Sequence, residues 1–121
     1  MNIIKAAVAH EVGAPLVVED VQLRAPEGSE VEVTLEAVAI CHSDIAYADG
    51  IWGGDLPAVF GHEAAGHVAA VGDGVSGFLA GDPVLATLIR ACGCCIPCAG
   101  GKPVLCANPS GLNPLRTANG E

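Results

Sequence analysis

The sequence is poor in aromatic and basic residues, and it has no long hydrophobic run. Only two Phe, one Trp and one Tyr occur among 121 residues, so any core must consist mainly of small aliphatic side chains. Five Lys and Arg residues face fourteen Asp and Glu residues, for a formal charge of −9. The scattered basic residues form no patch that could follow a phosphate backbone, and no apolar run reaches the ~20 residues of a membrane span. We therefore expect neither nucleic acid nor a membrane as a partner.

The N-terminus also lacks the basic segment and long apolar stretch of a signal peptide. This absence favours a cytoplasmic location, where thiols stay reduced. The length suits a single domain over residues 1–121. Six cysteines in such a chain indicate metal binding or catalysis before they indicate disulfides.

Alternation of apolar and polar residues and the positions of turn residues predict a mostly β domain. The predicted strands cover residues 3–10, 16–21, 30–37, 66–71 and 83–89, and a short helix is predicted over 41–50, with Ser43 or Asp44 near its start. The clearest alternation runs over residues 30–37, where Val31, Val33, Leu35 and Ala37 share one face. We expect that face to be buried and the opposite face to be wet. The predicted architecture is a partly open β-barrel.

Five of the six cysteines crowd into one glycine- and proline-rich segment. Four of them follow a C-x2-C-x2-C-x7-C spacing at Cys92, Cys95, Cys98 and Cys106. Four thiolates so close together can surround one Zn²⁺ tetrahedrally, and the metal would stabilise a lobe that has few large apolar side chains. Disulfides or unrelated thiols are the alternative reading. Cys94 is surplus: it is predicted to be a free thiol, and it could compete for a ligand position.

A second group of residues combines a cysteine with a histidine. The predicted strand over 30–37 leads to Cys41-His42-Ser43-Asp44, and Gly61-His62-Glu63-Ala64-Ala65-Gly66 follows later. Cys41 and His62 are suitable zinc ligands, and Asp44 could accept the second ring N–H of His62. A single Cys or His is more often a structural residue, so these residues alone leave both interpretations open.

Taken together, the motifs resemble the N-terminal, GroES-like catalytic domain of the zinc-dependent medium-chain alcohol dehydrogenases. The matching blocks are Cys41–Asp44, Gly61–Gly66, Gly81-Asp82-Pro83-Val84 and the spacing of the four cysteines from Cys92 to Cys106. Their order matches as well, so the resemblance covers nearly all of residues 3–110. It implies a GroES-like, partly open β-barrel with a zinc-binding cysteine lobe over 91–107, lacking the Rossmann domain. The cysteine lobe argues against the quinone-reductase branch of the superfamily.

The resemblance also implies two zinc sites. Cys41 and His62 would bind a catalytic zinc, with Asp44 as the hydrogen-bonding partner of His62 and Glu63 behind the metal as an occasional ligand. Ser43 would hydrogen-bond the alcohol and begin the removal of its proton. The four cysteines of the lobe would hold a structural zinc: Cys92, Cys95, Cys98 and Cys106.

Three further positions concern the proton route, the cofactor and the substrate. Ala46 stands where many family members carry a histidine that completes a proton relay. His42 occupies a position near the cofactor phosphates in the family. Tyr47 and Trp52 would either line the substrate pocket, as their counterparts do, or fill the core.

Family members continue into a Rossmann domain that binds NAD(P), and they supply a third catalytic-zinc ligand beyond the position of residue 121. The resemblance therefore implies a fragment of an alcohol dehydrogenase that is a homo-oligomer when full length. The complete enzyme would interconvert small alcohols and aldehydes with NAD(P), and we do not expect the chain to do so alone. Two alternatives remain: a stand-alone, non-catalytic zinc-binding module that engages a partner protein, and a GroES-like chaperone subunit, which leaves the cysteine lobe unexplained.

Overall fold

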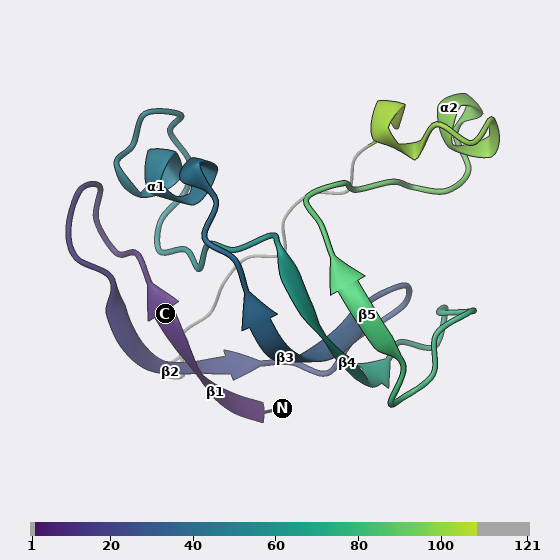
Figure 1. Ribbon diagram of the computed structural model, residues 1–121, viewed down its shortest axis with the longest axis horizontal. Coiled ribbons are helices and arrows are strands. Elements are labelled where there is room, and N and C mark those ends of the chain that lie inside the picture. Colours follow the sequence, from purple (N-terminus) through teal and green to yellow (C-terminus); the bar gives the residue numbers. More distant parts are fainter. Residues whose placement is uncertain (1, 109–121) are drawn as a thin grey trace.

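Strands dominate the computed structural model, which describes residues 2–108. In chain order the elements are β1 (Asn2–Val8), β2 (Val17–Leu23), β3 (Val31–Val38), α1 (His42–Ala48), β4 (Ala64–Val71), β5 (Pro83–Ala86), α2 (Ile96–Ala99) and the 3₁₀ helix η1 (Pro103–Leu105). The strands form an antiparallel β1–β2 hairpin and a three-stranded antiparallel sheet in the order β3–β4–β5. Both sheets are open rather than closed into a barrel (Figure 1). The predicted mostly β, partly open fold is confirmed, and no helix within the described residues is long and apolar enough to cross a membrane.

The register of β3 on β4 brings two distant segments of the chain together. Val38, the last residue of β3, pairs with Ala64, the first residue of β4. One step further along, the Ala39 N–H donates to the Glu63 carbonyl at 2.8 Å. The segment that leaves β3 and the segment that enters β4 therefore lie side by side, and these segments contain Cys41 and His62.

Gly66 permits the close approach of β4 to β3. A Cβ at this position would lie only 2.1 Å from the backbone oxygen of Thr34, far inside van der Waals contact. Gly66 is also buried, and a bulge interrupts the β3–β4 register just past its partner Leu35. The glycine is thus required by strand packing, because no side chain fits there.

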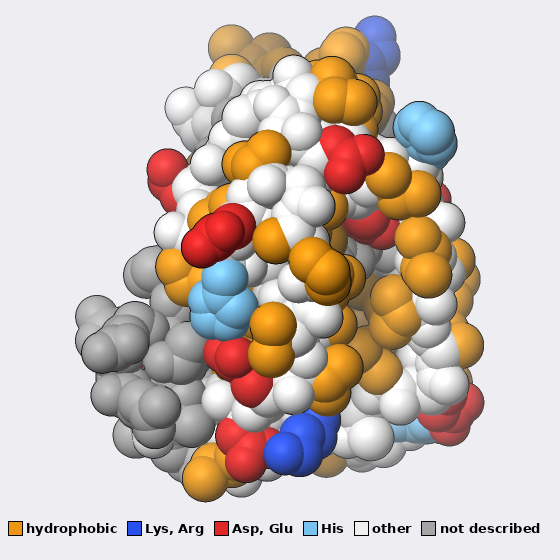
Figure 2. Space-filling model, turned by 90° about the vertical axis from the view of Figure 1, so that its left-hand side faces the viewer, with side chains coloured by type: hydrophobic (Ala, Val, Ile, Leu, Met, Phe, Trp, Pro, Cys, Tyr) orange, Lys and Arg blue, Asp and Glu red, His pale blue; other side chains and the backbone are white. Residues whose placement is uncertain are grey.

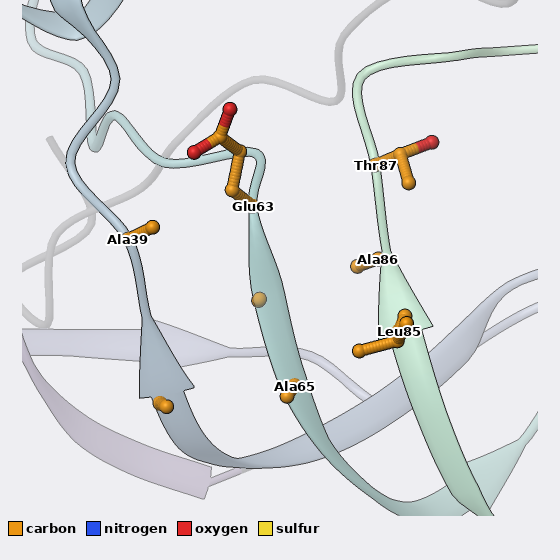
Figure 3. Close-up of a pocket in the computed structure, with 8 residues that line it drawn as sticks. Ala39, Glu63, Ala65, Leu85, Ala86 and Thr87 are labelled. Carbon is orange, nitrogen blue, oxygen red and sulfur yellow. The ribbon is translucent and has the colours of Figure 1, made fainter.

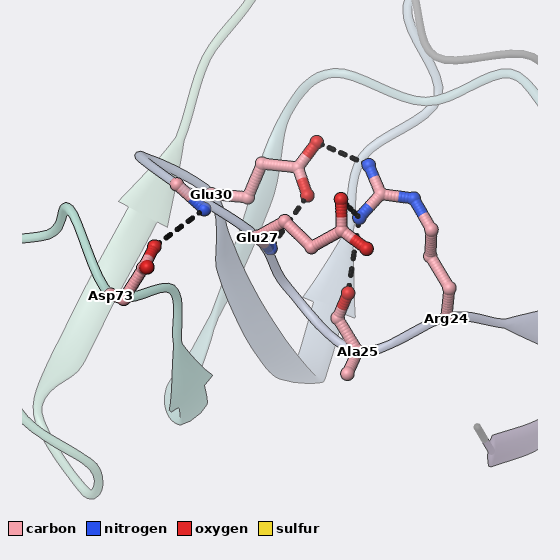
Figure 4. Close-up of polar contacts among 6 residues, drawn as sticks. Arg24, Ala25, Glu27, Glu30 and Asp73 are labelled. Carbon is pink, nitrogen blue, oxygen red and sulfur yellow. Dashed lines mark hydrogen bonds and ion pairs between the residues drawn. The ribbon is translucent and has the colours of Figure 1, made fainter.

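A polar network joins the β2–β3 connection to the turn after β4 (Figure 4). Arg24 Nη2 donates to Glu30 Oε1 at 2.6 Å, and the Glu30 carbonyl accepts the Gly72 N–H at 2.9 Å. The Gly28 N–H donates to Asp73 Oδ1 at 3.1 Å. These contacts hold the end of the three-stranded sheet that lies away from Cys41 and His62.

The prediction that one face of residues 30–37 is buried is wrong. Leu35 is 55% exposed, and Ala37 is exposed as well. An apolar face is buried only when another layer covers it, and within residues 2–108 the main contacts of β3, β4 and β5 are with neighbouring strands. Within residues 2–108 the buried hydrophobic side chains are Val8, Ala9, Val21, Ala46 and Val68, and Val68 of β4 is the cross-strand partner of Val33. Figure 2 shows many apolar side chains on the surface of the face that it presents.

Candidate metal sites

The first ligand group lies where β3 leaves the sheet and β4 enters it. Cys41 is the N-cap of α1, and His62 and Glu63 immediately precede β4. One ligand atom from each of these residues lies within 4.8 Å of the others. Cys41 and His62 are half-buried, whereas Glu63 is exposed. The structure therefore brings the Cys41 sulfur to the nitrogen and oxygen donors of His62 and Glu63, which lie far along the chain from it.

Asp44 and Ser43 contact opposite nitrogens of the His62 ring. Nδ1 lies 3.2 Å from Asp44 Oδ1, and Nε2 lies 3.4 Å from Ser43 Oγ. When the ring donates Nδ1–H to the carboxylate, Nε2 keeps its lone pair and is available to a metal. Asp44 also caps α1, because its Oδ2 accepts the Cys41 backbone N–H at 3.0 Å. Helix and ring are thus oriented by one carboxylate.

Hydrogen bonds in this group favour the charged forms of Cys41 and His62. The pKa of Cys41 is lowered, first by hydrogen bonds from Ser43 and then by one from His62. The pKa of His62 is raised, chiefly by the hydrogen bond with Cys41 and further by the charge of Asp44, although partial burial opposes this effect. A metal ligand must be a neutral imidazole, so binding at this site would release a proton from His62.

The second ligand group is the cysteine lobe, which follows β5 at the end of an extended segment (Figure 1). Its four predicted ligand sulfurs, from Cys92, Cys95, Cys98 and Cys106, all lie within 4.8 Å of one another. Zn–S bonds of about 2.3 Å place tetrahedral sulfurs about 3.8 Å apart. The separation of 4.0 Å between the sulfurs of Cys95 and Cys106 is close to that value. The four residues fit a tetrahedral ion, and all six cysteines of the chain are free thiols rather than disulfides.

Backbone N–H groups and burial act oppositely on two thiols of the lobe. The N–H groups of Cys94 and Cys95 point at the Cys92 sulfur and lower the pKa of Cys92 to about 6. Burial raises the pKa of Cys98 to about 12. A divalent cation favours the thiolate form of every ligand, so it would compensate for the burial of Cys98.

Three aromatic rings gather beside α1. The Tyr47 ring stacks on Phe60 with the centroids 5.9 Å apart, and it meets Trp52 edge to face at 5.2 Å. Tyr47 and Trp52 are exposed, so the alternative that they fill the core is wrong. Phe60 is not among the residues predicted from the sequence, although its place directly before Gly61-His62 is a usable signal.

His42 lies outside both ligand groups. It is the first residue of α1 and its side chain is exposed. Ala46, in the position of the family's relay histidine, is buried in the core. No ionisable side chain therefore occupies that position.

A shallow apolar groove adjoins the first ligand group (Figure 3). It runs over one face of the three-stranded sheet, and the Glu63 carboxylate stands at one end of it. The groove could not be predicted from the sequence, because its lining is mostly alanine and carries no motif. Residues that line it include Ala39, Ala65, Leu85, Ala86 and Thr87.

The structure is a mostly β domain with two groups of side chains that could hold a metal ion. The family model of the alcohol dehydrogenase GroES-like domain matches residues 27–120. The chain therefore belongs to the alcohol dehydrogenase GroES-like domain family, and the resemblance found in the sequence is confirmed.

Known alcohol dehydrogenases are similar to most of this chain. Alcohol dehydrogenase class-3 of Drosophila melanogaster is 45% identical over 103 residues, which cover 84% of this chain and 27% of that protein. The crystal structure of an alcohol dehydrogenase zinc-binding domain protein from Burkholderia ambifaria matches with a TM-score of 0.87 and 40% identity, over 99% of this chain and 35% of that one. Benzyl alcohol dehydrogenase from Acinetobacter calcoaceticus matches with a TM-score of 0.81 and 32% identity, over 100% of this chain and 33% of that one. The chain thus spans about a quarter to a third of the length of these oxidoreductases.

Proposed function

We propose that the chain is the catalytic-domain part of a zinc-dependent alcohol dehydrogenase that interconverts alcohols and aldehydes with NAD(P). One observation carries the proposal: Cys41, His62 and Glu63 present their ligand atoms within 4.8 Å of one another in a member of the alcohol dehydrogenase family. The chain spans only part of its relatives. We therefore assign the activity to a protein that also contains nicotinamide-binding residues, and we expect the 121-residue chain to be inactive by itself.

Two zinc ions fit the donors that the chain offers. Cys41 Sγ and His62 Nε2 would hold the catalytic ion, with the Glu63 carboxylate close enough to serve as an occasional ligand. When bound, this zinc supplies Lewis-acid polarisation of the substrate oxygen. The second, structural ion would be held by the lobe: Cys92, Cys95, Cys98 and Cys106.

Ser43 is the residue best placed to move the substrate proton. Its Oγ lies 3.4 Å from His62 Nε2, so the hydroxyl stands beside the nitrogen that would bind the metal, close to where the oxygen of a metal-bound alcohol would lie. There it can accept a hydrogen bond from the alcohol and take up the proton while releasing its own. Because Ala46 has no ionisable group, we propose that the proton leaves Ser43 for solvent. His42, at the exposed start of α1, is assigned to the cofactor phosphates.

Zinc content tests the metal part of the proposal. Elemental analysis of the purified, metal-replete chain should find zinc, with one equivalent lost in Cys95→Ser. Any equivalent held at the other site should be lost in His62→Ala and kept in the control His67→Ala, whose histidine is exposed on β4. Absence of zinc from the unaltered chain would overturn the proposal.

Turnover tests the rest. A zinc-loaded protein that contains this sequence and a nicotinamide-binding region should reduce NAD(P) with small or aromatic alcohols, and Cys41→Ser or His62→Ala should abolish the reaction. Failure with every alcohol class would contradict the assignment. A cytoplasmic location and a homo-oligomeric full-length enzyme stay predictions.

A further inference from the structure

Cys94 is the one cysteine that belongs to neither ligand group. Cys41 belongs to the first group, and the other four cysteines of the lobe form the second. The Cys94 side chain is exposed, and its sulfur lies 3.8 Å from the sulfur of Cys92. A fifth thiol therefore stands directly beside one of the four proposed zinc ligands.

The separation of these two sulfurs is that of neighbouring ligands on one ion. The edge of a tetrahedral Zn–S₄ group is about 3.8 Å, since each Zn–S bond is about 2.3 Å. Gly93 links the two cysteines with a φ of +79°, and nothing lies within 4 Å of where its Cβ would be. All three residues of the Cys92-Gly93-Cys94 segment are exposed, so the segment can move without displacing a packed side chain, although the Cys92 N–H donates to Cys106 Sγ at 3.3 Å.

Cys92 is the ligand that a competing thiol can reach most readily, although the Cys95 N–H donates to its sulfur at 3.4 Å. It is the exposed member of the four, whereas Cys95, Cys98 and Cys106 are half-buried. Cys95 and Cys98 are further fixed by α2, as its N-cap and within its single turn. Exchange is thus favoured at the one ligand position that faces solvent beside a second thiol.

We propose that Cys94 is an exchange ligand of the cysteine lobe, so that Cys95, Cys98 and Cys106 hold the metal with either Cys92 or Cys94 as the fourth thiolate. This inference rests on the structural zinc site proposed above. In each exchange the bond from Cys94 to the metal forms, the bond from Cys92 breaks, and one proton passes from Cys94 to Cys92. Four thiolates hold the ion in both states, so the charge is unchanged and no oxidant is needed. The exchange gives the ion a route to competing ligands through the solvent-facing side of the lobe.

Cobalt binding by the full chain tests this proposal, because thiolate-to-Co²⁺ absorption reports how many sulfurs bind. A Cys41→Ser background removes the other site. In that background Cys92→Ser should keep one Co²⁺ with the four-thiolate spectrum and an affinity within about tenfold of the parent. The matched control Cys98→Ser and the double variant Cys92→Ser/Cys94→Ser should lose the four-thiolate spectrum, with absorption no higher than three sulfurs give. They should also bind Co²⁺ at least about 100-fold more weakly, a larger effect than the loss of a hydrogen-bonding partner of a ligand.

The single variant Cys94→Ser supplies a kinetic readout. It should keep the parent affinity but transfer Co²⁺ or Zn²⁺ to a chelator several times more slowly. Exchange is refuted if Cys92→Ser binds no better than Cys98→Ser, or if Cys94→Ser releases the metal at the parent rate. If the parent lobe itself binds neither ion, the structural zinc site fails as well, so failure of the inference and failure of the proposed function are distinguishable.

Discussion

Asp44, a residue of α1, contacts the N-cap of its own helix with one carboxylate oxygen and His62 with the other. Oδ2 accepts the Cys41 N–H at 3.0 Å, and Oδ1 lies 3.2 Å from His62 Nδ1. We expect Asp44→Ala to lower the free energy of unfolding by about 1 kcal/mol, the usual effect of losing a helix cap. Metal affinity at Cys41 and His62 should fall about 10–100-fold, because the ring loses its orienting partner. Chemical denaturation and competition with a chelator measure the two effects.

Asp55→Ala is the matched control, since Asp55 is an exposed loop carboxylate. Asp44→Asn separates the two roles of Asp44, because the amide oxygen can still accept the Cys41 N–H of the helix, whereas the amide NH₂ cannot accept the Nδ1–H of His62. Equal metal affinities of Asp44→Ala and Asp55→Ala would contradict the expected role of Asp44 at the ring.

Ser43 governs the ionisation of Cys41 in the metal-free protein. Its hydrogen bonds are the largest cause of the lowered pKa of Cys41, ahead of the bond from His62. Ser43→Ala should therefore move the pH midpoint of Cys41 alkylation upward, toward the value of an ordinary thiol. Because the pKa of Cys41 is lower in the folded protein than in the unfolded chain, its ionisation stabilises the fold when the pH is above the pKa of an ordinary thiol. This stabilisation is lost as the pH falls through the lowered pKa of the folded protein. The variant should thus lose stability at alkaline pH and little at acid pH.

Iodoacetamide labelling followed by mass spectrometry of the Cys41 peptide measures the midpoint of that titration. Ser76→Ala, at an exposed position after β4, should leave it unchanged. An identical shift in both serine variants, or no shift in either, would show that Ser43 does not act on Cys41.

Much of the candidate site could be predicted from its residues, but its surroundings could not. The Cys41 and His62 motifs predict a shared site, and the structure places their ligand atoms together; their roles stay predictions. The stacking of Phe60 on Tyr47 depends on how the loop folds back over α1, and no local pattern encodes that path. The groove beside Glu63 could not be predicted either, because alanines have no functional group that would mark a binding site.

At the scale of elements, the pairing of β3 with β4 depends on Gly66. A Cβ at Gly66 would lie 2.1 Å from the Thr34 oxygen and 2.9 Å from the Thr34 carbonyl carbon. Because both atoms are backbone, no side-chain rotation relieves the clash, and Gly66→Ala should lower the free energy of unfolding by at least about 2 kcal/mol. Thermal or urea unfolding measures the loss. The neighbouring His67→Ala, on the exposed side of β4, should change it by less than about 0.5 kcal/mol.

The cysteine lobe should depend on metal in a way that the sheet does not. Neither α2 nor η1 has a buried residue, and their main contact with another element is with each other. Chelation should therefore release the backbone amides of residues 92–106 to rapid hydrogen exchange and leave those of β4 protected. Hydrogen exchange with mass spectrometry checks both segments in one sample. Equal exchange of the lobe with and without the chelator would contradict its dependence on metal.

Periodicity located the strands but could not define all of their ends. Residues 30–37 were predicted within a residue of β3, whereas the strand predicted over 83–89 stops at Ala86. Its last pair joins Ala86 to Ala64, where β4 begins. Beyond that pair the neighbouring chain turns toward His62, so Thr87 and the residues after it have no strand to extend. The end of a strand cannot be predicted from its own sequence when the end of the paired strand determines it.

At the scale of the whole molecule, the exposed apolar sheet face should bind hydrophobic probes. Leu85 is 81% exposed in the groove of Figure 3, where it pairs with Ala65 of β4. Leu85→Lys should reduce the fluorescence of a bound hydrophobic dye and change the free energy of unfolding by less than about 0.5 kcal/mol. Leu79→Lys, on a loop leucine of similar exposure (73%), should affect dye binding less. Equal losses would mean that the groove is no preferred site.

The pairing of Val38 with Ala64 also sets an order of events in time. Cys41 and His62 lie inside the loop that this strand pairing closes, and they are separated by the length of that loop until the strands meet. We therefore expect an ion to bridge the two residues only after these strands have paired. Interactions that form after the folding transition state slow unfolding and leave the folding rate nearly unchanged. Metal at this site would therefore lengthen the lifetime of the folded state rather than shorten the time needed to reach it.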